Sequence, residues 1–370
     1  MSSGSNPEPP PPPPLLSSVW AVPTTSPLWM VTQEPELNQL VAYLVRKRTE
    51  LQERPGVPQT MTFSRARLEQ VRAAFARMIR SGEARLHQLS ELLCRHFCPQ
   101  GVERNSLVVG AIEGSGERFT LQQRLSRQDL YAHTDRDLGH RLIERLRFVS
   151  DQGYQRATLV ANFVEYLPQA ENPFGIHRII SRIKAEEELW NKVADEIFDL
   201  DDLVRRDKKL CHLSRYVKDV FGIKVVVGDS RAVRRLQAEL ERLRFSDAQL
   251  AEVAAPCDET TRRLAIIEVK NYLGRDQRKQ SGWQALKSVV CWGDGAFEVQ
   301  IQPLVNYHRE LERLTRESHT SFKERRDRLR DEVAAQYPLF AFYRDLLRWL
   351  FLTPSASPPS FPGVELRLLD

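Results

Sequence analysis

The sequence has few cysteines, little excess charge and no long hydrophobic run. Its five cysteines are scattered along 370 residues, which suits a reducing cytosol better than a disulfide framework. No run of about 18 apolar residues occurs, so no membrane-spanning helix is expected. The net charge of +5 is too small for a nucleic-acid coat or a membrane-surface protein. We therefore expect a cytoplasmic protein without a membrane partner.

The sequence does contain enough apolar residues for a sizeable core. Hydrophobic residues make up 41% and charged residues 28% of the chain, which excludes global disorder, a collagen and a small disulfide scaffold. The length allows two or three domains, and no internal repeat is present.

Proline and serine are concentrated at both ends of the chain. Residues 1–33 include a proline run at 9–14 and no basic segment ahead of an apolar stretch, so they predict a disordered, extended tail and not a signal peptide. A segment that docks on a partner is the alternative. Residues 354–370 predict a second, flexible tail.

Residues 34–170 predict a mainly helical N-terminal region. Apolar residues recur at helical spacing over 34–95, and residues 138–148 and 159–167 continue this pattern. Between them, residues 106–121 predict a β-hairpin. No motif assigns a role to the region, which could sense a ligand, neutralise a toxic activity or mediate assembly into an oligomer.

From residue 171 the pattern changes to short apolar strands and charged helices. Strands are predicted at 175–183, 220–227, 264–269, 285–291 and 296–301, and helices at 185–197, 232–243 and 304–330. A tight turn at Gly293-Asp294-Gly295 joins the last two strands as a hairpin.

Together these patterns predict an α+β fold, with a mixed β-sheet flanked by helices over residues 171–330. Residues 331–353 predict an amphipathic helix that packs on this domain.

Two acidic residues lie where one metal ion could contact both. Asp219 begins one predicted strand, and Glu298 lies in another, where the two-residue period places Glu298 and Gln300 on one face. If the strands are neighbours, both carboxylates meet at one end of the sheet and suit Mg²⁺. The alternative is an ordinary charged residue on an exposed strand face.

Basic residues accompany this pair. Arg178, Arg182 and Lys184 alternate with apolar residues, and Lys192 follows two helical turns later. Arg182 and Lys184 on one strand face would form a phosphate clamp. A solvent-exposed polar face is the alternative.

A glycine-containing turn precedes an aromatic residue and a cation in Ser281-Gly282-Trp283-Gln284-Ala285-Leu286-Lys287. Trp283 could stack on a base, and Lys287 could bind a phosphate. Alternatively, Trp283 is an anchor of the core.

In order and spacing these motifs resemble the synthetase domain of the RelA/SpoT family, which has a nucleotidyltransferase-like fold. The resemblance covers roughly residues 173–330, less than half of the chain. The counterparts of the family motifs are Arg182-Ile183-Lys184-Ala185, Asp219-Val220-Phe221-Gly222-Ile223-Lys224, residues 281–287, Glu298-Val299-Gln300-Ile301-Gln302-Pro303, and His319 with Phe322-Lys323. No histidine is followed by aspartate, so the metal motif of the family's hydrolase domain is missing.

The resemblance implies a Mg²⁺-dependent pyrophosphokinase that transfers pyrophosphate from ATP to the 3′-hydroxyl of a guanine nucleotide, forming guanosine tetraphosphate or pentaphosphate. Asp219 and Glu298 would be the catalytic and metal-binding carboxylates, and Glu298 could instead deprotonate the attacking hydroxyl. By the same resemblance Trp283 would stack on the acceptor base in place of a tyrosine. The remaining nucleotide-binding positions would be Arg182, Lys184, Lys192, Lys224, Gln284, Lys287, Gln300, His319 and Lys323.

Four departures from the family pattern leave the acceptor open. Lys224 replaces an arginine, Ala185 a serine, Lys287 a histidine, and Gln302-Pro303 an Arg-Thr pair. One alternative is pyrophosphate transfer to the 3′ end of tRNA, as a toxin. Another is a catalytically silent module that binds nucleotides or partners.

A basic run could bind tRNA phosphates, or it could simply be a solvated helix face. Its members are Arg205, Arg206, Lys208, Lys209, Arg215 and Lys218.

Two further groups have the residue types of metal ligands without a standard zinc spacing. We interpret both as ordinary helix-surface or core residues. They are His133, Asp135, Asp137 and His140, and Cys94, His96 and Cys98.

Overall fold

The structure is a computed structural model. It describes residues 26–113, 115–150, 153–200, 216–274, 283–315 and 318–370, without the side chains of residues 150 and 311–326. The N-terminal tail before residue 26 and the basic run at 205–215 lie outside the described residues.

Helices and strands alternate along the chain. In the first half the elements are α2 (Pro35–Glu53), β1 (Gln59–Ser64), α3 (Arg65–Phe97), β2 (Val102–Ile112), β3 (Arg118–Arg124), α4 (Arg127–Ala132), α5 (Asp135–Ile143), β4 (Phe148–Ser150), β5 (Gly153–Gln155) and β6 (Ala157–Pro168). In the second half they are β7 (Ile176–Ile183), α6 (Glu186–Ile197), β8 (Phe221–Val227), α8 (Ser230–Arg242), α9 (Asp247–Glu252), β9 (Ala265–Asn271), β10 (Leu286–Trp292), β11 (Gly295–Pro303), α10 (Leu304–Thr315), α11 (Ser318–Gln336), α12 (Pro338–Phe351) and β12 (Val364–Leu369).

Eight of the strands form one mixed sheet in the order β3-β2-β6-β7-β8-β11-β10-β9. The neighbours are antiparallel except for β8 and β11, which are parallel. The α+β fold class predicted from the sequence, with a mixed sheet and flanking helices, is confirmed. The hairpin of β10 and β11 turns at Gly293, as predicted, and Gly293 has a φ of +60° that favours glycine.

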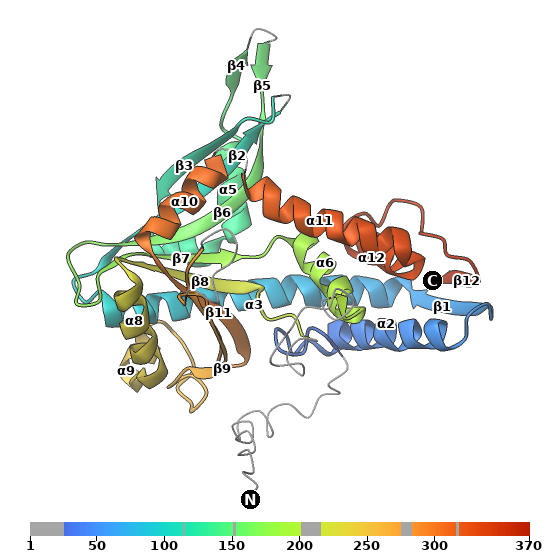
Figure 1. Cartoon of the computed structure of the whole chain (residues 1–370), viewed down its shortest axis with the longest axis horizontal. Helices are drawn as coiled ribbons and strands as arrows, with labels where there is room; N and C mark the ends of the chain where they lie inside the picture. Colours follow the sequence, from blue (N-terminus) through green and yellow to red (C-terminus); the bar gives the residue numbers. More distant parts are fainter. Residues whose placement is uncertain (1–25, 114, 151–152, 201–215, 275–282, 316–317) are drawn as a thin grey trace, which may run out of the picture.

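The two faces of this sheet differ in chemistry. On one face Ile223, Val225, Val299 and Ile301 are buried in the main apolar core, against α3 and α8. The other face carries charged side chains from the central strands and is crossed by α10 (Figure 1). Alternation along each strand produces this division, and it places the predicted site residues on the polar face.

A second group of helices packs beside the sheet around aromatic side chains. Trp190 of α6 stacks on Phe351 of α12, with ring centroids 3.6 Å apart, and Phe75 of α3 lies 5.0 Å from Trp190. The Tyr343 hydroxyl of α12 donates a hydrogen bond to the Leu44 carbonyl of α2 at 3.0 Å. In the part of the chain that the structure describes, no helix has both the length and the apolar composition needed to cross a membrane.

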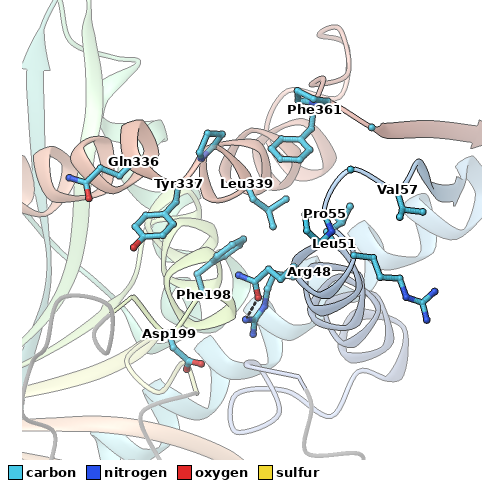
Figure 2. A pocket seen from close by; sticks show the side chains of 16 residues that line it. Arg48, Leu51, Pro55, Val57, Phe198, Asp199, Gln336, Tyr337, Leu339 and Phe361 are labelled. Carbon is cyan, nitrogen blue, oxygen red and sulfur yellow. Dashed lines mark hydrogen bonds between the residues drawn. The ribbon is translucent and has the colours of Figure 1, made fainter.

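A cavity of about 710 Å³ lies where α2 meets α12. Figure 2 shows apolar side chains, among them Phe198, Leu339 and Phe361, lining it together with the charged residues Arg48 and Asp199. None of the site residues predicted from the sequence lines it. This cavity therefore does not contribute to the site described below.

The N-terminal region contains the long helices α2 and α3 that the sequence predicts, but it also supplies strands to the sheet. Residues 159–167, predicted as helical, are part of β6, which pairs with both β2 and β7. The spacing of the apolar residues in this segment is compatible with a helix and also with a strand that has a neighbour on each side. The periodicity alone therefore could not distinguish the two. The prediction of one helix over 138–148 is also wrong, because α5 ends at Ile143 and Phe148 begins β4.

Two further differences concern the C-terminal part. The single helix predicted over 304–330 is two helices, α10 and α11. The flexible tail predicted for residues 354–370 is wrong for its end, because β12 pairs in parallel with β1. Alternate residues of β12 are partly buried, a strand signal that was obscured by the prolines preceding it.

One buried ion pair joins α11 to α6. Arg330 donates two hydrogen bonds to the Asp195 carboxylate, from Nε at 3.1 Å and from Nη2 at 3.0 Å. Both side chains are at most 4% exposed. Arg330 also bonds to Asp327 at 2.9 Å.

We predict that Asp195→Ala destabilises the protein by about 3 kcal/mol, because it leaves a buried guanidinium without its main partner. Arg330 keeps its hydrogen bond to Asp327 in this variant, so we expect a loss of stability at the lower end of the range found when one partner of a buried ion pair is removed. Urea unfolding measures the change.

Asp331→Ala is the matched control, since it removes an Arg344 partner that is 69% exposed. It should change stability by less than about 1 kcal/mol. Equal losses in the two variants would contradict the prediction.

Candidate active site

The register of the central strands brings Arg182 and Glu298 together. Gly222 of β8 pairs with Arg182 of β7 on one side and with Glu298 of β11 on the other. A Cβ at Gly222 would lie 3.3 Å from Nε and 3.4 Å from Cγ of Arg182, so the glycine leaves room for the arginine to cross β8. Arg182 Nη2 then reaches Glu298 Oε1 at 3.4 Å.

Asp219 lies next to this pair, just before β8. The Lys184 backbone N–H donates to the Val220 carbonyl at 2.8 Å, which holds this segment beside the end of β7. Lys184 Nζ donates to Asp219 Oδ2 at 2.9 Å. Asp219 Oδ1 is buried and has no hydrogen-bond partner among the described residues. One oxygen of this carboxylate is therefore available to a ligand.

Positive side chains keep both carboxylates ionised. Burial alone would raise the pKa of Asp219, but attraction to Lys184, Lys192 and Arg182 holds this pKa well below its usual range. Burial would likewise raise the pKa of Glu298. Attraction to Lys287 and Arg182 outweighs burial and the repulsion from Asp219, so the pKa of Glu298 is also lowered. Arg182 thus acts on both acids.

Lys287 reaches the site from β10. Its Nζ donates to Glu298 Oε1 at 2.9 Å and lies 5.8 Å from the ring centroid of Trp283. The Trp283 ring in turn lies 5.5 Å from that of Tyr272. Trp283 is only partly buried, so it is not the core anchor that was the alternative interpretation.

Glu310 of α10 joins several of the predicted residues, and the sequence analysis missed it. Its Oε2 accepts hydrogen bonds from Lys224 at 2.6 Å and Gln302 at 3.0 Å, and its Oε1 accepts one from the Trp283 indole at 2.8 Å. Gln300 extends this network by donating to Gln302 at 2.7 Å. Glu310 is one of many acids on a charged helix, and only its position over the sheet distinguishes it.

Some predicted residues do not contact the carboxylates. Lys192 of α6 pairs with Glu196 at 2.8 Å and acts on Asp219 only through its charge. Gln284 accepts a hydrogen bond from Asn306 through its backbone carbonyl. Lys218 pairs with Glu268 at 2.5 Å.

Other predicted residues are only partly described. His319 and Lys323 belong to α11, but their side chains are outside the described residues, as are Ser281, Gly282 and the basic run at 205–215.

We predict that Lys287→Met raises the pKa of Glu298, because it removes the strongest attraction that opposes burial. Carboxyl ¹³C NMR of glutamate-labelled protein in metal-free buffer measures this pKa, and Glu298→Gln identifies the signal. Lys270→Met is the control, since Lys270 contacts Glu268 at 3.0 Å. An unchanged pKa of Glu298 in Lys287→Met would contradict the assigned effect of Lys287.

The fold is similar to that of small alarmone synthetase 1 from Bacillus subtilis, whose crystal structure contains its product pppGpp. The alignment covers 45% of this chain and 83% of that protein, with 17% sequence identity and a TM-score of 0.21. No protein-family model matches the sequence, and no curated protein matches it.

Proposed function

We propose that the chain transfers pyrophosphate from ATP to the 3′-hydroxyl of a guanine nucleotide in a Mg²⁺-dependent reaction. The observation that carries the proposal is the pair of ionised carboxylates, Asp219 and Glu298, which share the cation Arg182 on the polar face of the sheet. Their order along the chain, with the basic motifs between and around them, is that of the RelA/SpoT synthetases.

The carboxylate pair fits Mg²⁺. This ion prefers oxygen ligands and is usually bound by one or two carboxylates together with substrate phosphates. The unpartnered Oδ1 of Asp219 and the Glu298 carboxylate supply such oxygens. When bound, Mg²⁺ would neutralise charge on the phosphate oxygens of ATP.

Three basic residues would bind the ATP phosphates. Arg182 and Lys184 each contact a carboxylate here, and Lys192 adds positive potential close by. A guanidinium can bind two phosphate oxygens at once, whereas an ammonium acts as a point charge. These cations would therefore exchange a carboxylate partner for a phosphate when the nucleotide enters.

In the proposed reaction the acceptor 3′-oxygen forms a bond to the β-phosphorus of ATP. The bond from that phosphorus to the bridging oxygen of the α-phosphate breaks, AMP leaves with the electron pair, and the hydroxyl proton passes to solvent or a nearby base. Positioning and charge neutralisation supply most of the acceleration in such transfers.

The electrostatics of the site favour a ligand role for Glu298. A general base is most effective when its pKa lies near the working pH, whereas Lys287 and Arg182 lower the pKa of Glu298. We therefore assign Glu298 to the metal and not to the hydroxyl proton.

Trp283 is the best candidate for contact with the acceptor base. Its indole N–H is held by Glu310, which fixes the plane of the ring, and Lys287 lies within cation–π distance of that ring. A guanine base stacked on Trp283 would bring its phosphates within reach of the basic residues of β7 and β10.

We predict that Asp219→Asn lowers pyrophosphate transfer by about a thousand-fold or more, because a metal ligand contributes several kcal/mol to stabilising the transition state. The assay uses γ-labelled ATP, Mg²⁺ and, separately, GDP, GTP or bulk tRNA. Asp247→Asn is the matched control: this carboxylate on α9 pairs with Arg262 and is 63% exposed. Its activity should equal that of the wild type.

The same assay separates the alternatives. Label on GDP or GTP supports the proposal, and label on tRNA alone redirects it to the tRNA 3′ end. ATP binding without transfer to any acceptor would overturn the proposed activity in favour of a silent nucleotide-binding module. Transfer that survives in Asp219→Asn would overturn the assigned carboxylate.

We also predict that Trp283→Leu weakens acceptor binding by about 1–3 kcal/mol, the usual contribution of one stacked base, and leaves ATP binding unchanged. Trp283→Tyr keeps an aromatic face and should retain most of the affinity. Steady-state KM values for acceptor and ATP measure the two effects. A parallel loss for both substrates would contradict the assignment.

A further inference from the structure

A buried cluster of two acids and one histidine lies on the opposite face of the sheet from the candidate active site. Glu83 and His87 are one turn apart on α3, so they share a face of that helix, and Asp135 is the first residue of α5. Glu83 and Asp135 are each 4% exposed, and His87 is 1% exposed. In the described parts of the chain, this is the one group of three or more His, Cys, Asp or Glu residues with spacing suited to a metal ion.

The separations between these side chains match a shared metal ion. His87 Nε2 lies 3.1 Å from Asp135 Oδ1 and 3.9 Å from Glu83 Oε1, and one ligand atom from each residue lies within 4.8 Å of the others. Ligands about 2.1 Å from one ion are ~3.0 Å apart at a right angle and ~3.4 Å apart at a tetrahedral angle. Small side-chain adjustments therefore suffice to bring all three onto one ion.

One oxygen in the cluster has no partner. Asp135 Oδ2 has no hydrogen-bond partner among the residues that the structure describes. The side chain is also almost fully buried, since Asp135 is only 4% exposed. A buried acceptor of this kind is costly unless it is satisfied by hydrogen bonds or an ion. Two carboxylates and a neutral imidazole carry a charge of −2, which a divalent cation balances.

Neighbouring groups orient the three side chains. The Tyr166 hydroxyl of β6 lies 3.4 Å from His87 Nδ1, so the other ring nitrogen, Nε2, faces the acids. The Asp135 backbone N–H donates to Glu83 Oε1, and the Asn162 amide donates to the Asp135 carbonyl. Partners of this kind typically fix the ring and ligand positions in protein metal sites.

A cavity gives access to the cluster. It has a volume of about 600 Å³, and both Glu83 and His87 line it, together with Arg80, His133 and Thr134. A metal ion could enter through this cavity, and water could occupy the coordination positions that face it.

We propose that Glu83, His87 and Asp135 bind a divalent transition-metal ion of the Mn²⁺ or Zn²⁺ type. Imidazole nitrogen is a ligand of transition metals, whereas Mg²⁺ prefers oxygen alone, so this site differs in metal preference from the carboxylate pair. The sequence analysis assigned Asp135 to ordinary surface or core residues, because its ligand partners are 52 and 48 positions away. The proposal is independent of the proposed transferase activity.

Mn²⁺ binding to the full-length, metal-stripped chain tests the proposal. The carboxylate pair is first removed by Asp219→Asn and Glu298→Gln, and electron paramagnetic resonance then measures free Mn²⁺ during titration. We expect one bound Mn²⁺ per chain that Zn²⁺ displaces, with spin-echo modulation from one imidazole nitrogen. Excess Mg²⁺ should not displace it.

Substitutions identify the ligands in the same background. Tyr166→Phe, which removes a partner of a ligand, should weaken Mn²⁺ binding by about 10–100-fold. Asp135→Asn and Glu83→Gln keep the size of the side chain but remove a ligand, so each should weaken Mn²⁺ binding by more than this. His96→Ala is the control, because His96 is exposed at the end of the same helix. It should bind Mn²⁺ like its parent.

Three outcomes would overturn the proposal: no stoichiometric Mn²⁺ or Zn²⁺, bound Mn²⁺ without nitrogen modulation, or equal affinity in Asp135→Asn and its parent. Each would show that these three side chains do not together bind the metal ion. Circular dichroism establishes that each variant is folded. The nitrogen modulation is measured in the parent, which keeps all three proposed ligands, so this test does not depend on the folding of a variant in the cluster.

Discussion

The register between β7, β8 and β11 determines where the charged groups of the candidate site lie. Gly222 is paired on both sides, and the residues opposite it are Arg182 and Glu298. A slip of β11 by one position would turn Glu298 toward α3 and would bring Val299 and Ile301 to the polar face. Because these apolar residues are fully buried, the hydrophobic effect that forms the core also enforces the position of the charges.

In the candidate site, the acidic and basic side chains of the chain pair with one another. Each carboxylate has a cation within about one hydrogen-bond length, which keeps it ionised despite burial. The same contacts occupy the cations that would bind phosphates. Ligand binding would therefore be an exchange of partners between groups that are already ordered, and this ordering reduces the entropy lost when a nucleotide binds.

Local sequence predicted those parts of the site that depend on strand periodicity. The two-residue period placed Glu298 and Gln300 on one face, and the Gly293 turn predicted the hairpin that carries Lys287 to Glu298. Glu310 could not be found in this way, because its contact with Trp283 spans 27 positions and its helix contains many similar acids. The strand β6 was missed for a related reason: its identity depends on pairing with β2 and β7, which are distant in the chain or come later in it.

The strand β6 also links the two faces of the sheet. Glu165 points toward α10, where it accepts a hydrogen bond from the Tyr307 hydroxyl at 3.4 Å, and the next residue, Tyr166, points toward His87 on α3. Alternation along one strand thus contributes to two clusters with different chemistry: oxygen ligands with permanent cations on one face, and an imidazole with two acids on the other. We propose the first for a hard ion that arrives with phosphates, and the second for a transition metal held by the protein itself. Since the second cluster joins α3 and α5 beneath β6, a metal bound there would stabilise the packing of the sheet without touching a nucleotide.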